Sequence, residues 1–273
     1  MFQESAEIVA HELIAFKTYL VRLRCPKIAS QIRPGQFVMI KLPQGNDPLL
    51  GRPFALYDTF CDEQGNASAI DIVYLQVGKM TSLFPLIGLG QSVEVWGPLG
   101  KPFPIIPEKK IVTFIAGGIG QTPFLAFGKQ LLGLKAYGGD SPEKVANKIV
   151  MIYGVRSAPF LAGVEHFKSI GMELLCATDD GSFGFHGRVT ELLKTLPKVD
   201  HWFGCGPELM LHTLSFLAKE KNVPCHISLE SPMACGLGIC FSCVVKIKTE
   251  EGWDYKRICV DGPVFDSNSL VFD

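Results

Sequence analysis

The amino-acid sequence predicts a multi-domain β plus α/β protein: an antiparallel β-barrel over residues 1–102, a doubly wound parallel α/β domain over residues 103–228, and a small cysteine-rich domain over residues 229–273. Three observations predict this order. Short β-rich runs alternate with turn clusters in the first region, and apolar runs alternate with segments of helical period in the second. In the third region four of the nine cysteines gather without a clear helical period, so we expect a metal centre in place of a separate core.

The first region contains four strand-like runs, at residues 16–25, 36–42, 69–77 and 91–97. Turn clusters rich in glycine, proline, asparagine and aspartate separate them. One short helix is expected over residues 81–88. Because strands at this spacing have no long helices between them, they predict an antiparallel barrel or sandwich.

The second region contains five apolar runs, at residues 111–117, 148–154, 172–178, 201–206 and 225–230. Their alternation with helical segments is typical of a parallel, doubly wound sheet. Pro123 and Pro207 each stand at the expected first position of a helix, where the missing N–H of proline costs nothing. Asn222 is the expected end of the helix that follows Pro207.

Composition argues against nucleic-acid and membrane partners. The 273 residues include 26 basic and 27 acidic side chains, with no run of five like charges. The N-terminus has no basic leader, and no apolar stretch reaches the roughly 18 residues of a membrane span. We therefore expect a soluble cytoplasmic protein whose clustered cysteines are ligands rather than disulfides.

The cysteine spacing C-x4-C-x2-C, formed by Cys235, Cys240 and Cys243 and followed by Cys259, matches the plant-type [2Fe–2S] pattern. A structural zinc site and free packed cysteines are the alternatives. Zinc ligands usually come as two short pairs, whereas the fourth cysteine here stands alone, so the cluster is favoured. The remaining cysteines are expected in the core, mostly within strands: Cys25, Cys61, Cys176, Cys205 and Cys225.

A glycine-rich turn follows the first apolar run of the second region and precedes a helix start. It contains Gly117, Gly118 and Gly120, with Pro123 after them. In this setting main-chain N–H groups and the helix dipole bind a pyrophosphate, so we favour nucleotide binding. A tight strand-to-helix turn is the simpler alternative.

Further candidates for the same cleft follow later strands, because ligands bind at the carboxyl ends of strands in an open α/β sheet. Each has a simpler interpretation as a cap, a turn residue or a solvent-exposed arginine. These candidates are Arg156, Thr178, Asp179, Asp180, Cys205, Gly206 and Pro207.

In the first region Arg52 stands beside Pro53, in the stretch GRPFALYD. The guanidinium could form a charge-assisted bond to a phosphate, held by a chain that the proline stiffens. On these residues alone a surface arginine at a strand start is the more ordinary interpretation.

Together these motifs resemble the ferredoxin-NADP reductase superfamily. The resemblance rests on the Arg-Pro stretch, the GGxGxxP loop and the GCGP sequence after a later strand. The tail, SLESPMACGLGICFSC followed by CVDGPVFD, resembles the electron-transfer subunits of class B dihydroorotate dehydrogenase, and the likeness covers essentially the whole chain. It implies FAD in the barrel, NAD(H) in the middle domain and a [2Fe–2S] cluster at the C-terminus.

The resemblance also implies particular residues. The ring of Tyr74 is expected near the isoalloxazine, and Thr81 is expected to open the short helix that faces the pyrophosphate. The implied flavin contacts are Arg52, Pro53, Phe54, Ala55, Val73, Tyr74, Leu75, Met80 and Thr81, and the implied cluster ligands are Cys235, Cys240, Cys243 and Cys259. Two residues depart from the family pattern, Ala55 in place of serine and Met80 in place of glycine, and both bear on flavin affinity and potential.

The expected function is an electron conduit for pyrimidine biosynthesis in which no residue of this chain acts as an acid or base. The family implies a partner subunit with FMN that oxidises dihydroorotate, electron transfer through the cluster and FAD to NAD+, and a heterotetramer of two plus two subunits. Asp179 and Asp180 disfavour the extra phosphate of NADP, Arg156 favours it, and the family favours NAD.

Two alternatives remain at this point. The same cofactors would serve a reductase subunit of a hydrogenase, a sulfide dehydrogenase or a ferredoxin-NADP transhydrogenase. A non-catalytic interaction protein with a zinc-stapled tail belongs to another class altogether.

Overall fold

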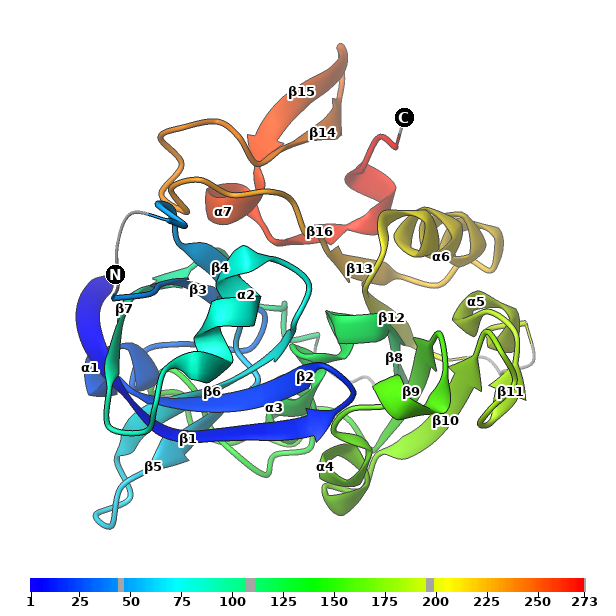
Figure 1. Ribbon diagram of the computed structural model, residues 1–273. Coiled ribbons are helices and arrows are strands. Elements are labelled where there is room, and N and C mark those ends of the chain that lie inside the picture. The colour runs from blue at the N-terminus through cyan, green and yellow to red at the C-terminus, as the bar shows by residue number, and fades with distance from the viewer. Residues whose placement is uncertain (44–46, 107–110, 195–198, 273) are drawn as a thin grey trace.

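The computed structural model describes residues 1–43, 47–106, 111–194 and 199–272. It contains two seven-stranded sheets and a two-stranded hairpin (Figure 1). The first sheet belongs to the N-terminal region and the second to the middle region, with one strand added from the C-terminal tail. Among the described residues, the longest apolar helical segments fall short of what a membrane crossing requires.

The N-terminal sheet is antiparallel throughout, with the order β4-β3-β7-β1-β2-β6-β5. Its elements are β1 (Phe2–Ala15), β2 (Thr18–Arg24), α1 (Pro26–Ala29), β3 (Phe37–Lys41), β4 (Arg52–Ala55), β5 (Asp58–Cys61), β6 (Ala67–Leu75), α2 (Lys79–Leu83), the 3-10 turn η1 (Phe84–Leu86) and β7 (Ser92–Leu99). The four predicted runs are β2, β3, β6 and β7, and the predicted helix is α2 with η1.

Three strands of this sheet were not predicted. β1 is long, but only Ala6 and Ile8 along it are buried, so its alternation is weak. β4 is short and contains a proline, which the edge position tolerates because one side of the strand needs no ladder hydrogen bond. β5 is an edge strand as well, and its last two residues are exposed.

The second sheet has the order β11-β10-β9-β8-β12-β13-β16. Its strands are β8 (Ile111–Gly117), β9 (Lys148–Val155), β10 (Glu173–Thr178), β11 (Phe185–His186), β12 (His201–Cys205), β13 (Cys225–Ser228) and β16 (Val264–Asp266). All neighbours are parallel except the last pair, β13 and β16. The five predicted runs are confirmed as β8, β9, β10, β12 and β13.

Helices cover both faces of this sheet because successive residues of a strand point to opposite sides. Phe114 and Met151 pack in one core with α3 (Phe124–Leu131) and α4 (Val164–Ser169), whereas their neighbours Ile115 and Ile152 pack in another. The second core includes residues of α5 (Val189–Leu192) and α6 (Glu208–Glu220). Strand order reverses between β8 and β12, so the ligand-binding switch point lies between them.

The predicted helix signals are correct to within two residues. Pro123 and Pro207 stand immediately before α3 and α6 rather than at their first residues, and the 3-10 turn η2 (Gly118–Gln121) separates β8 from α3. Asn222 has a φ of 52°, in the left-handed region that ends a helix.

The C-terminal tail is less separate than the sequence suggests. It forms the hairpin β14 (Val244–Thr249) and β15 (Gly252–Arg257), then α7 (Ile258–Asp261), β16 and the 3-10 turn η4 (Ser267–Ser269). Figure 1 shows the hairpin projecting away from the body, while β16 completes the α/β sheet. Cys243 and Cys259 are buried in a core shared with Met39 of the barrel and Ile227 of β13. Because the tail shares a core and a sheet with the other regions, the domain boundaries at residues 102/103 and 228/229 stay predictions.

A set of stacked phenylalanines anchors the segment that leaves the barrel. Phe103 stacks on Phe127 of α3 with ring centroids 4.4 Å apart, and Phe127 packs edge-on against Phe203 of β12 at 4.8 Å. Phe127 and Phe114 are fully buried. These contacts tie the end of the barrel to one face of the α/β sheet.

We expect Phe127→Ala to lower the free energy of unfolding by about 3–5 kcal/mol, because it removes a fully buried ring and leaves a cavity. Urea unfolding followed by circular dichroism measures the loss. Phe216→Ala in α6 is the control, since that ring is 66% exposed and its loss should cost less than about 0.5 kcal/mol. Equal losses for the two variants would contradict the packing described.

Candidate functional site

A cleft of about 1100 Å³ lies between the barrel and the carboxyl edge of the α/β sheet. Its barrel wall is the β1–β2 turn and the end of β6, and its other wall is the set of loops that follow β8, β9, β10 and β12. The turn is fastened across the cleft, since Phe16 N–H donates to the Pro159 carbonyl at 2.9 Å. The cleft collects these predicted residues: Leu75, Gly117, Gly118, Gly120, Arg156, Asp179, Gly206 and Pro207.

The glycine loop packs directly on the loop after β12. A Cβ on Gly120 would lie 2.4 Å from the Cys205 carbonyl oxygen, and one on Gly117 would lie 2.7 Å from Pro207. Gly118 has a φ of +55° with open space around it. The tight-turn interpretation therefore explains Gly117 and Gly120, and Gly118 is the glycine that leaves room for a ligand.

The loop after β10 contains three residues that were predicted to line the cleft, and only one of them does so. The hydroxyl of Thr178 donates to the Phe183 carbonyl at 2.8 Å, and Asp180 accepts from the hydroxyl of Ser182 at 2.6 Å. The hydrogen bonds from Ser182 lower the pKa of Asp180 below its ordinary value. Both residues close the turn, so the simpler interpretation holds for them. Asp179 alone of the three lines the cleft.

Cys205 is buried with 3% exposure, and burial raises the pKa of its thiol. The thiol is therefore neutral and points into the protein interior. The carbonyl group of the residue contacts the glycine loop. Pro123 likewise lies outside the lining of the cleft and caps α3.

Four charged residues line the cleft without having been predicted: Lys17, Arg188, Glu191 and Glu230. Glu230 opens onto the cleft, and desolvation there raises the pKa of its carboxyl group. It ends the predicted run 225–230, so the strand-end rule that nominated Asp179 would have found it too.

The predicted pyrophosphate contacts in the barrel stay predictions, and three of those residues lie as follows. Arg52 is exposed, and its Nη1 donates to the carbonyls of Leu50 and Gly51 at 2.9 and 3.1 Å, which holds the guanidinium at the surface. Met80 is 2% exposed and packs in the barrel core, so its side chain does not block the start of α2. Thr81 accepts from the N–H groups of the two residues before α2 and orders that turn.

The ring of Tyr74 packs inside the barrel. It is 1% exposed, stacks between Tyr19 and Phe84 with centroids 5.5 and 5.1 Å away, and its hydroxyl meets His11 Nε2 at 2.7 Å. The ring is thus covered inside the barrel, and its place beside the isoalloxazine stays a prediction. Val73, Tyr74 and Leu75 remain predicted flavin contacts.

The four tail cysteines form two pairs. The sulfur atoms of Cys235 and Cys240 are 3.3 Å apart in the outer pair, and Cys243 and Cys259 interact in a pair that is buried. Hydrogen bonds from Ser242, then from Cys235, lower the pKa of Cys240 to about 6. Burial, then contact with Cys243, raises the pKa of Cys259 to about 12.

This donor set fits a two-iron cluster better than a single ion. Two thiolate pairs suit two irons joined by sulfide, each completed by one pair. Gly236 and Gly238 take left-handed φ values of 71° and 79°, and Leu237 N–H donates to Cys235 sulfur at 3.2 Å. The loop therefore curls around its sulfurs and points an amide at them.

The cysteine loop sits directly on the barrel. Trp96 of β7 donates from Nε1 to the Cys235 carbonyl at 3.2 Å. A Cβ on Gly236 would lie 2.7 Å from Met39 of β3. Figure 1 shows this segment, drawn in orange, against the β3 and β4 side of the barrel. Sequence reasoning missed both barrel contacts because nothing local marks a tryptophan or a methionine as a support for a distant loop.

The other five cysteines follow the core prediction with one exception. Cys25, Cys205 and Cys225 are buried and Cys176 is partly buried, but Cys61 is exposed. The prediction was wrong for Cys61 because it ends an edge strand whose last residues face outward.

The barrel, the cleft beneath a glycine loop and the paired cysteines define a class: an FAD-binding oxidoreductase of the ferredoxin reductase type with an iron–sulfur tail. The family model of the oxidoreductase FAD-binding domain matches residues 5–103. The family model of the iron-sulfur cluster binding domain of dihydroorotate dehydrogenase B matches residues 230–271.

Relatives identify the particular family. The chain is 35% identical over 272 residues to the dihydroorotate dehydrogenase B (NAD(+)) electron transfer subunit of Geobacillus kaustophilus, with 98% of each chain covered. It is 33% identical to the subunit of the same name from Desulforamulus reducens, again with 98% of each chain covered. The chain belongs to this family of electron transfer subunits, and it is an oxidoreductase subunit with an FAD domain and an iron–sulfur domain.

A solved structure is also similar over nearly the whole chain. It is that of an NADH-dependent reduced ferredoxin-NADP oxidoreductase, described for flavin-based electron bifurcation. The TM-score is 0.82 at 30% identity, with 98% of this chain and 90% of that chain covered. The fold is thus shared with an enzyme that is described by a different activity.

Replacing Cys240 by serine is expected to abolish stable cluster binding, because one of the outer thiolates is lost. Iron and sulfide analysis with the visible spectrum of the anaerobically purified protein measures this. Cys61→Ser is the matched control, since Cys61 is a free, exposed thiol far along the chain from the loop. Full iron content in the Cys240 variant would contradict the assignment of the ligands.

Gly120→Ala is expected to weaken NADH binding by about tenfold or more, since its Cβ would force the glycine loop away from the Cys205 carbonyl. Titration of the protein with NADH, followed by flavin absorbance, gives the affinity. Gly88→Ala is the control because nothing lies within 4 Å of its added Cβ. An unchanged affinity in the Gly120 variant would show that the contact between these loops does not shape the binding site.

Proposed function

We propose that this chain carries electrons between a catalytic, FMN-containing dihydroorotate dehydrogenase subunit and NAD+, by way of a [2Fe–2S] cluster and FAD, in de novo pyrimidine biosynthesis. One observation supports this most: the cysteine loop is seated on β3 and β7 of the same barrel whose other side borders the nucleotide cleft. A flavin supplies the conversion between two-electron hydride transfer and the one-electron transfer of a cluster. In this proposal the flavin in the barrel lies between the cluster site and the nucleotide cleft.

The proposal assigns the residues as follows. Arg52 and the start of α2 hold the pyrophosphate of FAD, and Asp179 receives the ribose of NAD and disfavours the added phosphate of NADP by charge. The flavin contacts are Arg52, Pro53, Phe54, Ala55, Val73, Tyr74, Leu75, Met80 and Thr81. The nucleotide contacts are Gly117, Gly118, Gly120, Pro123, Asp179, Cys205, Gly206 and Pro207. The cluster ligands are Cys235, Cys240, Cys243 and Cys259.

The chain's own part in this process is to bind, orient and insulate. The inner cysteine pair is buried in the shared core, and the outer pair faces the surface, where a partner can approach. We infer that the partner docks at the outer pair in a heterotetramer of two plus two subunits. We place the assembly in the cytoplasm, where thiols stay reduced and available as ligands.

The second candidate is a subunit of a ferredoxin-NADP transhydrogenase. The likeness over 98% of the chain to the reduced ferredoxin-NADP oxidoreductase structure favours it. The two candidates share all three cofactor sites in this chain, so they differ in the partner and in the substrate that the partner oxidises. The cysteine tail favours the first, since its family model is that of dihydroorotate dehydrogenase B.

Co-expression with a dihydroorotate-oxidising, FMN-containing subunit tests the proposal. We expect a coloured complex that contains flavin and iron, in which dihydroorotate reduces NAD+. The complex built with the Cys240→Ser subunit is expected to keep dihydroorotate oxidation with an artificial acceptor but to lose at least about 99% of NAD+ reduction. A complex that reduces ferredoxin with NADPH but ignores dihydroorotate would favour the second candidate. A colourless chain without iron would overturn both.

A further inference from the structure

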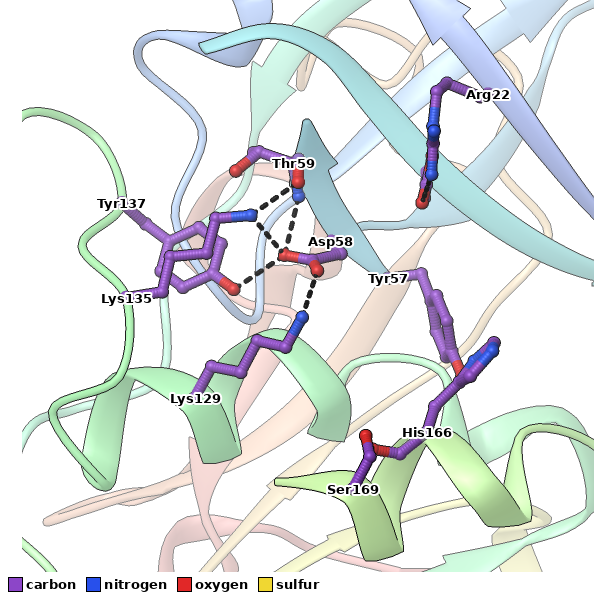
Figure 2. Close-up of polar contacts among 10 residues, drawn as sticks. Arg22, Tyr57, Asp58, Thr59, Lys129, Lys135, Tyr137, His166 and Ser169 are labelled. Atoms are coloured by element: carbon purple, nitrogen blue, oxygen red, sulfur yellow. Dashed lines mark hydrogen bonds and ion pairs between the residues drawn. The ribbon is translucent and has the colours of Figure 1, made fainter. Parts of the chain in front are cut away.

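The most densely bonded carboxylate that the structure describes lies between the barrel and the α/β domain. Asp58, the first residue of β5, is 8% exposed. Lys129 Nζ donates to it at 2.5 Å, Lys135 Nζ at 2.9 Å and the Tyr137 hydroxyl at 2.7 Å (Figure 2). The N–H of Thr59 adds a bond at 2.8 Å. Burial alone would favour the neutral acid, but the charges of Lys135 and Lys129 and their hydrogen bonds lower the pKa of Asp58.

The three side-chain donors all come from the other domain. Lys129 belongs to α3, and Lys135 and Tyr137 belong to the loop that follows it. The residue before Asp58 makes the same crossing, since the Tyr57 hydroxyl meets His166 Nδ1 of α4 at 2.7 Å and its carbonyl accepts from Ala126 N–H of α3 at 3.1 Å. Residues 57–59 therefore hold both helices that cover this face of the α/β sheet.

These helices border the nucleotide cleft. α3 continues directly from the glycine loop, of which residues 117–120 line the cleft. The loop that leads into α4 contributes Ala162 to the lining, and its next residue, Gly163, is so close to the Tyr57 hydroxyl that an added Cβ would lie 2.5 Å from it. A shift of α3 and α4 relative to β5 would thus move one wall of the cleft against the other.

A second carboxylate provides an internal comparison. Asp71 of β6 stands directly opposite Asp58 in the strand pair, and it is 6% exposed. Its cation is Arg22 of β2, at 2.7 and 2.8 Å, and this pair lies within the barrel. The two carboxylates thus match in burial and strand register, but only Asp58 is bonded across the domain boundary.

We propose that Asp58 is a positioning residue that fixes the nucleotide-binding wall against the flavin-binding barrel and so sets the approach of nicotinamide to flavin. The inference rests on the function proposed above. In that reaction reduced FAD gives a hydride to NAD+ and releases one proton to water, so that NADH and oxidised FAD form. The same contact serves the reverse step, in which NADH gives its hydride to FAD and FAD takes up one proton from water. Hydride transfer needs the reacting atoms in close, aligned contact, and small displacements lower its rate strongly.

The test compares Asp58→Asn with Asp71→Asn in the complete subunit with its partner. We expect Asp58→Asn to lower the limiting rate of flavin bleaching by saturating NADH about 10- to 100-fold, and Asp58→Glu to restore part of it. Asp71→Asn should stay within about threefold of the wild-type rate, because its broken ion pair lies inside the barrel. Reduction of flavin and cluster by dithionite should be the same in all three.

A second readout does not depend on NADH. Amide hydrogen exchange in residues 124–131 and 163–169 is expected to rise in Asp58→Asn and to stay at the wild-type level in Asp71→Asn. If Asp58→Asn does not fold, Lys129→Met removes one donor from the opposite side and should show the same two changes more weakly.

The outcomes separate the two proposals. A wild-type flavin that NADH does not bleach overturns the proposed function, and hydrogen exchange alone then decides whether Asp58 holds α3 and α4. Normal bleaching and normal exchange in Asp58→Asn overturn the positioning role. Equal slowing and equal exchange in the Asp71→Asn control overturn it too, since the effect would then be a general loss of barrel stability.

Discussion

The hydrophobic core shared by all three regions is the constraint on which the rest of the structure depends. It contains Phe37, Met39 and Leu99 of the barrel, Ile227 of the α/β sheet, and the two inner cysteines of the tail. A tail of this length cannot bury a core alone, so its cysteine loop must rest on another surface. Because that surface is the barrel, the position of the cluster site is fixed relative to the flavin domain by packing rather than by the length of a linker.

Polar contacts also fix how the regions meet. Asp58 is stripped of water where β5 meets α3, and a buried carboxylate is tolerated only when cations and hydrogen bonds compensate for the lost hydration. Such a network has a defined geometry, since leaving any donor or acceptor unpaired is costly. The apolar core therefore joins the regions, and the carboxylate specifies how β5 and α3 meet.

Close main-chain approach explains most of the glycines at the sites. Gly120 and Gly236 each leave no room for a Cβ, one against the loop after β12 and the other against Met39. The sequence predicted Gly120 to face a ligand, whereas each of these two glycines first serves contact between two protein segments. The ligand sites are consequences of that contact, because the contacts between the segments fix the shape of the cleft and of the cysteine loop. Gly118, with open space at a left-handed φ, is the position left for a bound group.

The sequence by itself determined the strands of regular period, the helix boundaries at Pro123, Pro207 and Asn222, and the four cysteines whose spacing indicates a cluster. These are local properties, set by periodicity, main-chain dihedral preferences and ligand spacing. Only the tertiary structure decided that Tyr74 turns into the barrel core, that Asp179 rather than Thr178 or Asp180 faces the cleft, and that Asp58 and Trp96 support distant segments. The direction of a side chain and the partner of a buried charge depend on residues far away in the chain, and no local pattern carries that information.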